Sequence, residues 1–186
     1  MGSSAGRVAI AAASLASLAV TLIYGFSDDS LWSFAARCDN RDTVTFYYAA
    51  RGALSGLDPY NNQALQQVYG VFAWWVYPPS ALPLFLPLTL LPFAGAVIVF
   101  NVLKAIAAVA LIAVWRSALP ALGRDIAFWL FAGVALNTTV LQDWCSGNIA
   151  IFESLAIWGA VLLSLRSRPV AACAVIVLIS LIKPLW

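Results

Sequence analysis

Long apolar runs separated by single charged residues make up most of the chain. Residues 8–26 are an uncharged run of nineteen residues with Arg7 just before it. This length and charge bias are typical of a membrane-spanning helix with a cytoplasmic N-terminus. Later apolar runs cover residues 93–115, 126–142, 149–165 and 170–182. The pattern therefore predicts five spanning helices.

Arginines between the runs predict the direction in which each helix crosses. If 8–26 crosses outward and 93–115 returns, the arginines that follow lie on the cytoplasmic side, as the positive-inside bias expects: Arg116, Arg124, Arg166 and Arg168. Residues 27–92 then form an external loop, and 143–148 form an external turn. An alternative is a hairpin of two spans within 80–115, which places the loop after Arg116 outside, against that bias.

The external loop is predicted to hold two interfacial helices. Asp42 occupies the place of an N-cap before a helix over 43–55, and Gly56 follows as its stop. We expect an apolar face of this helix to lie on the membrane surface. Residues 77–92 hold five prolines, and the apolar piece within them, 80–91, is too short for the roughly 20 residues that a span needs. This second piece is therefore expected to be interfacial or re-entrant.

Composition narrows the class of protein further. Hydrophobic residues make up 63% of the 186, charged residues 10%, and the mean hydropathy is +0.90, which predicts an all-α integral membrane protein with the bilayer as partner. The net charge of +2 is carried by scattered cations, which excludes a nucleic-acid partner. Histidine is absent and the three cysteines lack metal-ligand spacing. Acid–base chemistry therefore rests on eight carboxylates.

One stretch, residues 37–60, holds six of the eighteen charged side chains. Its arginines, Arg37, Arg41 and Arg51, are candidates for phosphate binding or for surface pairs with the neighbouring acids. Lys104 and Glu153 lie inside predicted spans. Inserting a charged side chain there costs about 2.5 to 3.5 kcal/mol unless it is paired or hydrated, so both are expected to face the interior of the bundle.

Four sequence blocks carry a resemblance to a known family. They are "DTVTFYYAARGALSGLDPY" (42–60), "YPPSALPLFLPLTLLPF" (77–93), "SGNIAIFESL" (146–155) and "IKP" (182–184). In this order they resemble glycosyltransferase family 87, membrane enzymes that use a polyprenyl-phosphate sugar as donor, over nearly the whole chain after residue 38. The resemblance implies the N-terminal transmembrane module of a GT-C-type fold.

The resemblance also implies a mechanism. A carboxylate of the first external loop removes a proton from the acceptor hydroxyl, and the sugar, mannose- or arabinose-like, moves with inversion to an external glycan or glycolipid. Asp42 matches the position of this base, Asp39 is the second choice, and Asp58 fits a turn better. No cofactor is implied. Asp39, Asp42 and Asp143 are nonetheless potential ligands of a divalent metal if they converge.

Several further residues are candidates for substrate binding. Gly147 and Asn148 place an amide near a sugar hydroxyl, or simply form a turn between two helices; many relatives have Gly-Gln at this point. Lys183 is a candidate partner of the donor phosphate, with a snorkelling interfacial lysine as the alternative. Tyr60 and Tyr77 complete the set of candidates.

The resemblance bears on length and location as well. Family members run to about two domain-lengths, so we expect this chain to be an N-terminal portion, truncated at Trp186 just after Lys183-Pro184 and inactive if the donor-binding remainder is missing. A bacterial plasma membrane is expected. Cys38 and Cys145 are both external in this topology and form a disulfide if the compartment is oxidising. The competing hypotheses are a small transporter subunit and a non-catalytic membrane scaffold or remnant.

Overall fold

The computed structural model describes residues 40–120 and 126–183, together with Val8, Ala12 and Ala16. The side chains of Ala127 and of residues 137–142 are outside this description. The predicted span over 8–26, and with it Arg37, Cys38 and Asp39, falls outside it too. The residues that are described form helices joined by turns, with no strand among them.

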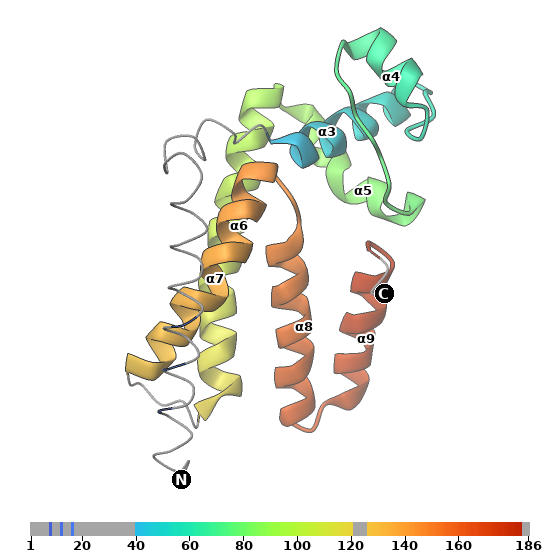
Figure 1. Ribbon diagram of the computed structural model, residues 1–186. Helices are drawn as coiled ribbons and strands as arrows, with labels where there is room; N and C mark the ends of the chain where they lie inside the picture. The colour runs from blue at the N-terminus through green and yellow to red at the C-terminus, as the bar shows by residue number, and fades with distance from the viewer. Residues whose placement is uncertain (1–7, 9–11, 13–15, 17–39, 121–125, 184–186) are drawn as a thin grey trace.

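Four long helices run side by side, and shorter helices lie across one end of them (Figure 1). The long helices are α6 (Phe93–Ala118), α7 (Ile126–Ser146), α8 (Ala150–Leu165) and α9 (Pro169–Ser180). The end pieces are α3 (Arg41–Leu54), α4 (Asn62–Tyr69), η1 (Pro79–Ala81), α5 (Leu82–Phe85) and η2 (Leu86–Leu90). Helix α8 packs against both α6 and α9, so it is the centre of the long-helix layer.

Helix α6 is the part of the described chain that is both long and apolar enough to cross a membrane. Its residues Ala96, Phe100, Lys104, Ala107 and Leu111 are buried and recur every three or four positions, which defines one inward face. The opposite face is exposed yet equally apolar: Ile98, Val102, Ile106 and Val109. Helices α8 and α9 are apolar but shorter.

Helix α3 differs from its prediction in what its apolar face contacts. Phe46 and Ala50 were expected to rest on lipid, but both are fully buried against protein. The Phe46 ring stacks on Phe85 with a centroid distance of 4.3 Å and meets Tyr77 edge-on at 5.2 Å. Aromatic contacts of this kind fix relative orientation as well as burying area. The prediction of a helix lying on the bilayer was therefore wrong for this face, because α5 and η2 already cover it.

The proline-rich piece predicted over 80–91 is three short helical turns in a row. Prolines stand at the first or second position of η1, α5 and η2, where the missing N–H costs nothing. Each proline also prevents the preceding turn from continuing as one regular helix. The Tyr47 hydroxyl donates to the Leu91 carbonyl at 2.8 Å, which fastens the end of this piece to α3.

Candidate functional site

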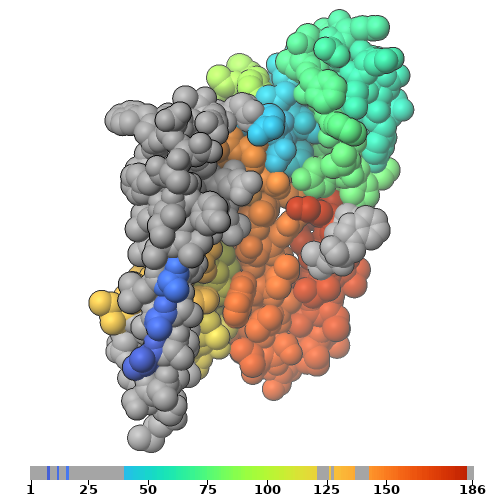
Figure 2. Space-filling model, in the orientation of Figure 1, coloured from blue at the N-terminus to red at the C-terminus, as the bar shows by residue number. Residues whose placement is uncertain are grey.

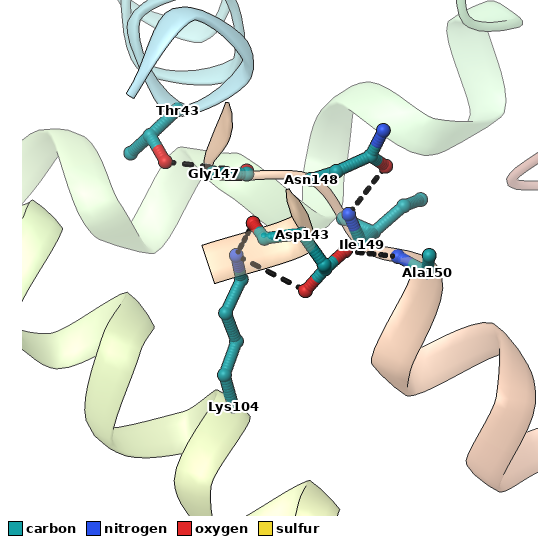
Figure 3. Close-up of polar contacts among 7 residues, drawn as sticks. All are labelled: Thr43, Lys104, Asp143, Gly147, Asn148, Ile149 and Ala150. Carbon is teal, nitrogen blue, oxygen red and sulfur yellow. Dashed lines mark hydrogen bonds and ion pairs between the residues drawn. The ribbon is translucent and has the colours of Figure 1, made fainter. Parts of the chain in front are cut away.

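The turn between α7 and α8 is closed by Asp143. The sequence placed this residue just beyond a span ending at residue 142, but α7 continues to Ser146, so Asp143 lies in its last turn and is only 4% exposed. Its Oδ1 accepts from the Ala150 N–H at 2.9 Å, and its carbonyl accepts from the N–H groups of Gly147 and Asn148 at 2.9 and 3.1 Å. Figure 3 shows this side chain at the centre of the turn. Asp143 thus satisfies amide groups that the helix end would leave unpaired.

Lys104 reaches this turn from α6. Its side chain is fully buried, its Nζ lies 3.2 Å from Asp143 Oδ2, and it donates to the Asp143 carbonyl at 2.6 Å (Figure 3). The prediction that Lys104 faces the interior is confirmed. Its partner is Asp143, while Glu153 pairs with Lys183 instead.

Gly147 brings the turn against the start of α3. Its φ is +76°, and a Cβ built there would lie 2.9 Å from the Thr43 nitrogen and 3.0 Å from the Thr43 Cβ. The Thr43 hydroxyl donates to the Gly147 carbonyl at 3.2 Å (Figure 3), and the Asn40 N–H donates to the Cys145 carbonyl at 3.0 Å. Glycine is therefore required here by both backbone angle and space.

Asn148 has a structural contact that fits the turn interpretation. Its Oδ1 accepts from the neighbouring Ile149 N–H at 2.6 Å, as short polar side chains commonly do in turns. Its amide nitrogen points away from Asp143 in Figure 3. The Asn148 oxygen is therefore occupied by the turn, whereas its amide nitrogen is directed away from it.

Asp42 lies in the first turn of α3, not at its cap. Asn40 occupies the cap position with a φ of 51° and no side-chain cap hydrogen bond, so the interpretation of Asp42 as the N-cap was wrong. The Asp42 carboxylate is half-buried. Burial raises the pKa of Asp42 above its ordinary 3.8, and the Ser146 side chain and the cations Arg41, Lys104 and Lys183 oppose the rise.

Tyr77 lies in the same neighbourhood. It is 9% exposed, and burial raises the pKa of its phenol, with further contributions from the charges of Asp42, Glu153 and Asp143. The phenol is therefore a protonated donor within electrostatic range of three carboxylates. Tyr60 is half-exposed and donates its hydroxyl to the Tyr77 carbonyl at 2.7 Å, so it supports the backbone at Tyr77.

An apolar cavity of about 190 Å³ opens beside this cluster. Glu153 is its only charged lining residue among the described ones, and its Oε1 is buried without a hydrogen-bond partner there. Its Oε2 lies 3.3 Å from Lys183 Nζ. The remaining lining comes from η2 and its neighbours, α6, α8 and the end of α9: Leu84, Phe85, Leu88, Phe100, Leu103, Ile149, Phe152, Ile179 and Ile182.

The other charged candidates of the loop lie apart from this cluster. Asp58 is exposed and accepts from the Tyr60 N–H at 2.9 Å, so it forms the predicted turn. Arg51 donates to the Tyr47 hydroxyl at 3.2 Å, near the far end of α3. Within the described ranges, no group of three or more His, Cys, Asp or Glu side chains is placed to hold a metal ion, and Asp39 is outside those ranges.

Sequence reasoning missed Thr43, whose hydroxyl donates to the Gly147 carbonyl, and Ser146, whose side chain lowers the pKa of Asp42. No pattern in the sequence singles out either hydroxyl. Of the two cysteines predicted to pair, Cys145 is disulfide-bonded. Cys173 is a free, exposed thiol. Cys38, the predicted partner, is not among the described residues.

A comparison with protein families decides the class of this chain. The profile of glycosyltransferase family 87 matches residues 75–186. The chain belongs to glycosyltransferase family 87. Membership implies glycosyl transfer between a sugar donor and an acceptor. Neither the curated proteins nor the solved structures contain a match to it.

The family 87 match covers most of the site but not all of it. Tyr77, Glu153, Lys183 and the α7–α8 turn fall inside the matched residues, whereas α3 with Asp42 precedes them. The position of Asp42 against the matched part therefore rests on the contacts of α3 with the turn and on nothing in the match itself.

Proposed function

We propose that this family 87 chain moves a mannose- or arabinose-like sugar from a polyprenyl-phosphate donor to the hydroxyl of an external glycan or glycolipid, with inversion. The observation that carries the proposal is the half-buried Asp42 carboxylate in the first turn of α3, which packs against the α7–α8 turn and lies within electrostatic range of the cations Arg41, Lys104 and Lys183. A carboxylate so placed has no capping role to explain it.

In the proposed reaction, Asp42 accepts the proton of the acceptor hydroxyl as that oxygen bonds to the anomeric carbon. The bond from this carbon to the phosphate oxygen breaks, and polyprenyl phosphate leaves with the electron pair. Attack opposite to the leaving group inverts the configuration. Lys183 lies 3.3 Å from Glu153 and is half-buried, so it is the cation we assign to the leaving phosphate.

The apolar surroundings support a lipid-linked donor. The cavity beside Glu153 is lined almost wholly by aliphatic and aromatic side chains, and α6 exposes an apolar face along its length. Both apolar surfaces are suited to contact with lipid hydrocarbon rather than water. We therefore propose a multi-pass protein of the bacterial plasma membrane whose site faces outward, with the isoprenoid in lipid and the sugar phosphate at the surface.

The proposed topology predicts which positions a membrane-impermeant thiol reagent reaches. In a Cys173→Ser background, Ser55→Cys on α3 is expected to react in intact cells, because that helix lies on the external side. Ser117→Cys, at the other end of α6, is expected to react only after permeabilisation. Both serines are exposed, so access to the compartment decides the result. The reverse pattern would contradict the outward-facing site.

The rate is expected to depend on the ionisation of Asp42. Because burial raises the pKa of this carboxyl above 3.8, kcat/KM should fall as the pH drops through a value above 3.8, where the base becomes protonated. The measurement is the pH profile of transfer. An acid limb at or below 3.8 would argue against Asp42 as the base.

The stereochemical claim is tested on the product. NMR of the newly formed linkage is expected to show an anomeric configuration opposite to that of the donor, because a single displacement inverts the carbon. Retention of configuration would require a second displacement and would contradict the role proposed for Asp42.

A further inference from the structure

We propose that the buried Lys104–Asp143 ion pair is a positioning device for Asp42, acting through the α7–α8 turn. The inference rests on the proposed function, in which Asp42 is the base. Neither Lys104 nor Asp143 is placed to touch the substrate in this account. Their effect runs through three steps: the pair anchors the turn to α6, the turn holds the first turn of α3, and that first turn carries the base.

The first step is the anchor. Lys104 is fully buried, contacts both Asp143 Oδ2 and the Asp143 carbonyl, and lies 5.2 Å from the centre of the Phe100 ring. Removing one partner of such a pair leaves an uncompensated buried charge, while replacing both by neutral groups is often tolerated. A double neutral replacement of the pair can therefore leave the fold stable, which allows a second role of the pair to be tested apart from stability.

The second step is the turn itself. The Asp143 carbonyl accepts from Gly147 and Asn148 as well as from Lys104, so a shift of the lysine moves the same oxygen that shapes the turn. Asp143 Oδ1 meanwhile binds the first amide of α8, that of Ala150. One residue thus couples α6, the end of α7 and the start of α8 (Figure 3).

The third step joins the turn to α3. Two hydrogen bonds cross this junction: the Asn40 N–H donates to the Cys145 carbonyl at 3.0 Å, and the Thr43 hydroxyl donates to the Gly147 carbonyl at 3.2 Å. Asn40, the cap of α3, and Thr43, in its first turn, stand on either side of the proposed base in the chain. The position of the Asp42 carboxylate is therefore set by a turn that Lys104 holds.

The charged and titratable groups around Asp42 show that the pair also belongs to its electrostatic surroundings. These groups come from each neighbouring element: Arg41 on α3, Tyr77 before η1, Lys104 on α6, Asp143 on α7, Glu153 on α8 and Lys183 after α9. The Lys104 charge lowers the pKa of Asp42. A neutral replacement of both partners removes this cation, so kcat is compared at a pH where Asp42 is ionised in both proteins, which leaves position as the main variable.

The test uses the double variant Lys104→Met/Asp143→Asn in the full chain. Asparagine keeps an oxygen for the Ala150 N–H, so the turn retains its internal bond while losing its anchor to α6. The expected result is a kcat lower by roughly 10- to 100-fold, the cost of a base displaced by about 1 Å, with KM for donor and acceptor within about twofold of wild type. Arg116→Met, which removes an exposed cation from the same helix, is the matched control and should leave both parameters unchanged.

A second variant covers the case in which the double variant fails to fold. Thr43→Val removes the hydroxyl that binds Gly147 without changing any charge, and a smaller fall in kcat at constant KM is expected. An unchanged kcat in either folded variant would overturn the inference, and so would a loss of folded protein with normal kcat in what remains.

Hydrogen–deuterium exchange separates this inference from the proposed function. Amides in the first turn of α3 should exchange faster in the double variant than in wild type or Arg116→Met, whether or not any sugar is transferred. If exchange is faster in the double variant but the wild-type protein transfers no sugar, the positioning of Asp42 is supported and the proposed reaction is contradicted. Unchanged exchange would overturn the positioning inference itself.

Discussion

Replacing Asp42 with asparagine is expected to lower the rate of sugar transfer by about 10²- to 10⁴-fold, the usual contribution of a general base. The amide has nearly the shape of the carboxylate but no affinity for the acceptor proton. Helix α3 should remain, because Asn40 rather than Asp42 stands at its cap position and a charge in the first turn contributes only about 0.3 to 1 kcal/mol. Circular dichroism and transfer kinetics on the same sample measure both effects.

Asp58→Asn is the matched control for this loss. Asp58 lies just after α3, is exposed, and binds the Tyr60 N–H through an oxygen that asparagine also supplies. We expect transfer and stability to stay at wild-type levels. If Asp42→Asn retained the wild-type rate, or if both variants lost it equally, Asp42 would not be the base.

Gly147→Ala is expected to cause the largest loss of stability. The positive φ of +76° costs an alanine about 1 to 2 kcal/mol. Its Cβ would also press against Thr43, an overpacking that typically adds about 1 to 3 kcal/mol. The sum, about 2 to 5 kcal/mol, should appear in thermal or denaturant unfolding of the purified protein, together with loss of transfer as α3 is displaced.

Gly56→Ala isolates the two contributions to that loss. Gly56 has nearly the same φ, +78°, but a Cβ there would meet nothing within 4 Å. Only the backbone cost of about 1 to 2 kcal/mol is expected, with transfer unchanged. Equal destabilisation by the two substitutions would show that crowding against Thr43 adds nothing to the loss of stability in Gly147→Ala.

The long helices could be predicted because apolar runs and their flanking charges are local features. The range 93–115 lies within α6, and 149–165 nearly coincides with α8. The end of α7 was missed because polar residues after Gln142 look like a loop, whereas Asp143 is buried by a lysine from another helix. Local sequence cannot show such a distant partner.

The site was predictable in its residue types and less so in its geometry. Asp42, Tyr77, Gly147 and Lys183 stood out as polar or permissive residues between apolar runs, and the structure gathers them at one end of the helix layer. The contact of the apolar face of α3 was predicted wrongly, because such a face has the same sequence pattern whether it packs on lipid or on α5. The pairing of Lys104 with Asp143 could not be predicted from the sequence, because it depends on how α6 packs against the end of α7.

The most direct test of the central claim is transfer from a labelled donor. The chain, expressed from its native reading frame and placed in lipid nanodiscs, is given polyprenyl-phosphate mannose or arabinose labelled in the sugar, with a glycolipid acceptor. The account predicts that one donor delivers label to the acceptor in step with the release of polyprenyl phosphate, and that Asp42→Asn abolishes both. Folded wild-type protein that transfers from neither donor, or an Asp42→Asn variant as active as wild type, would contradict it.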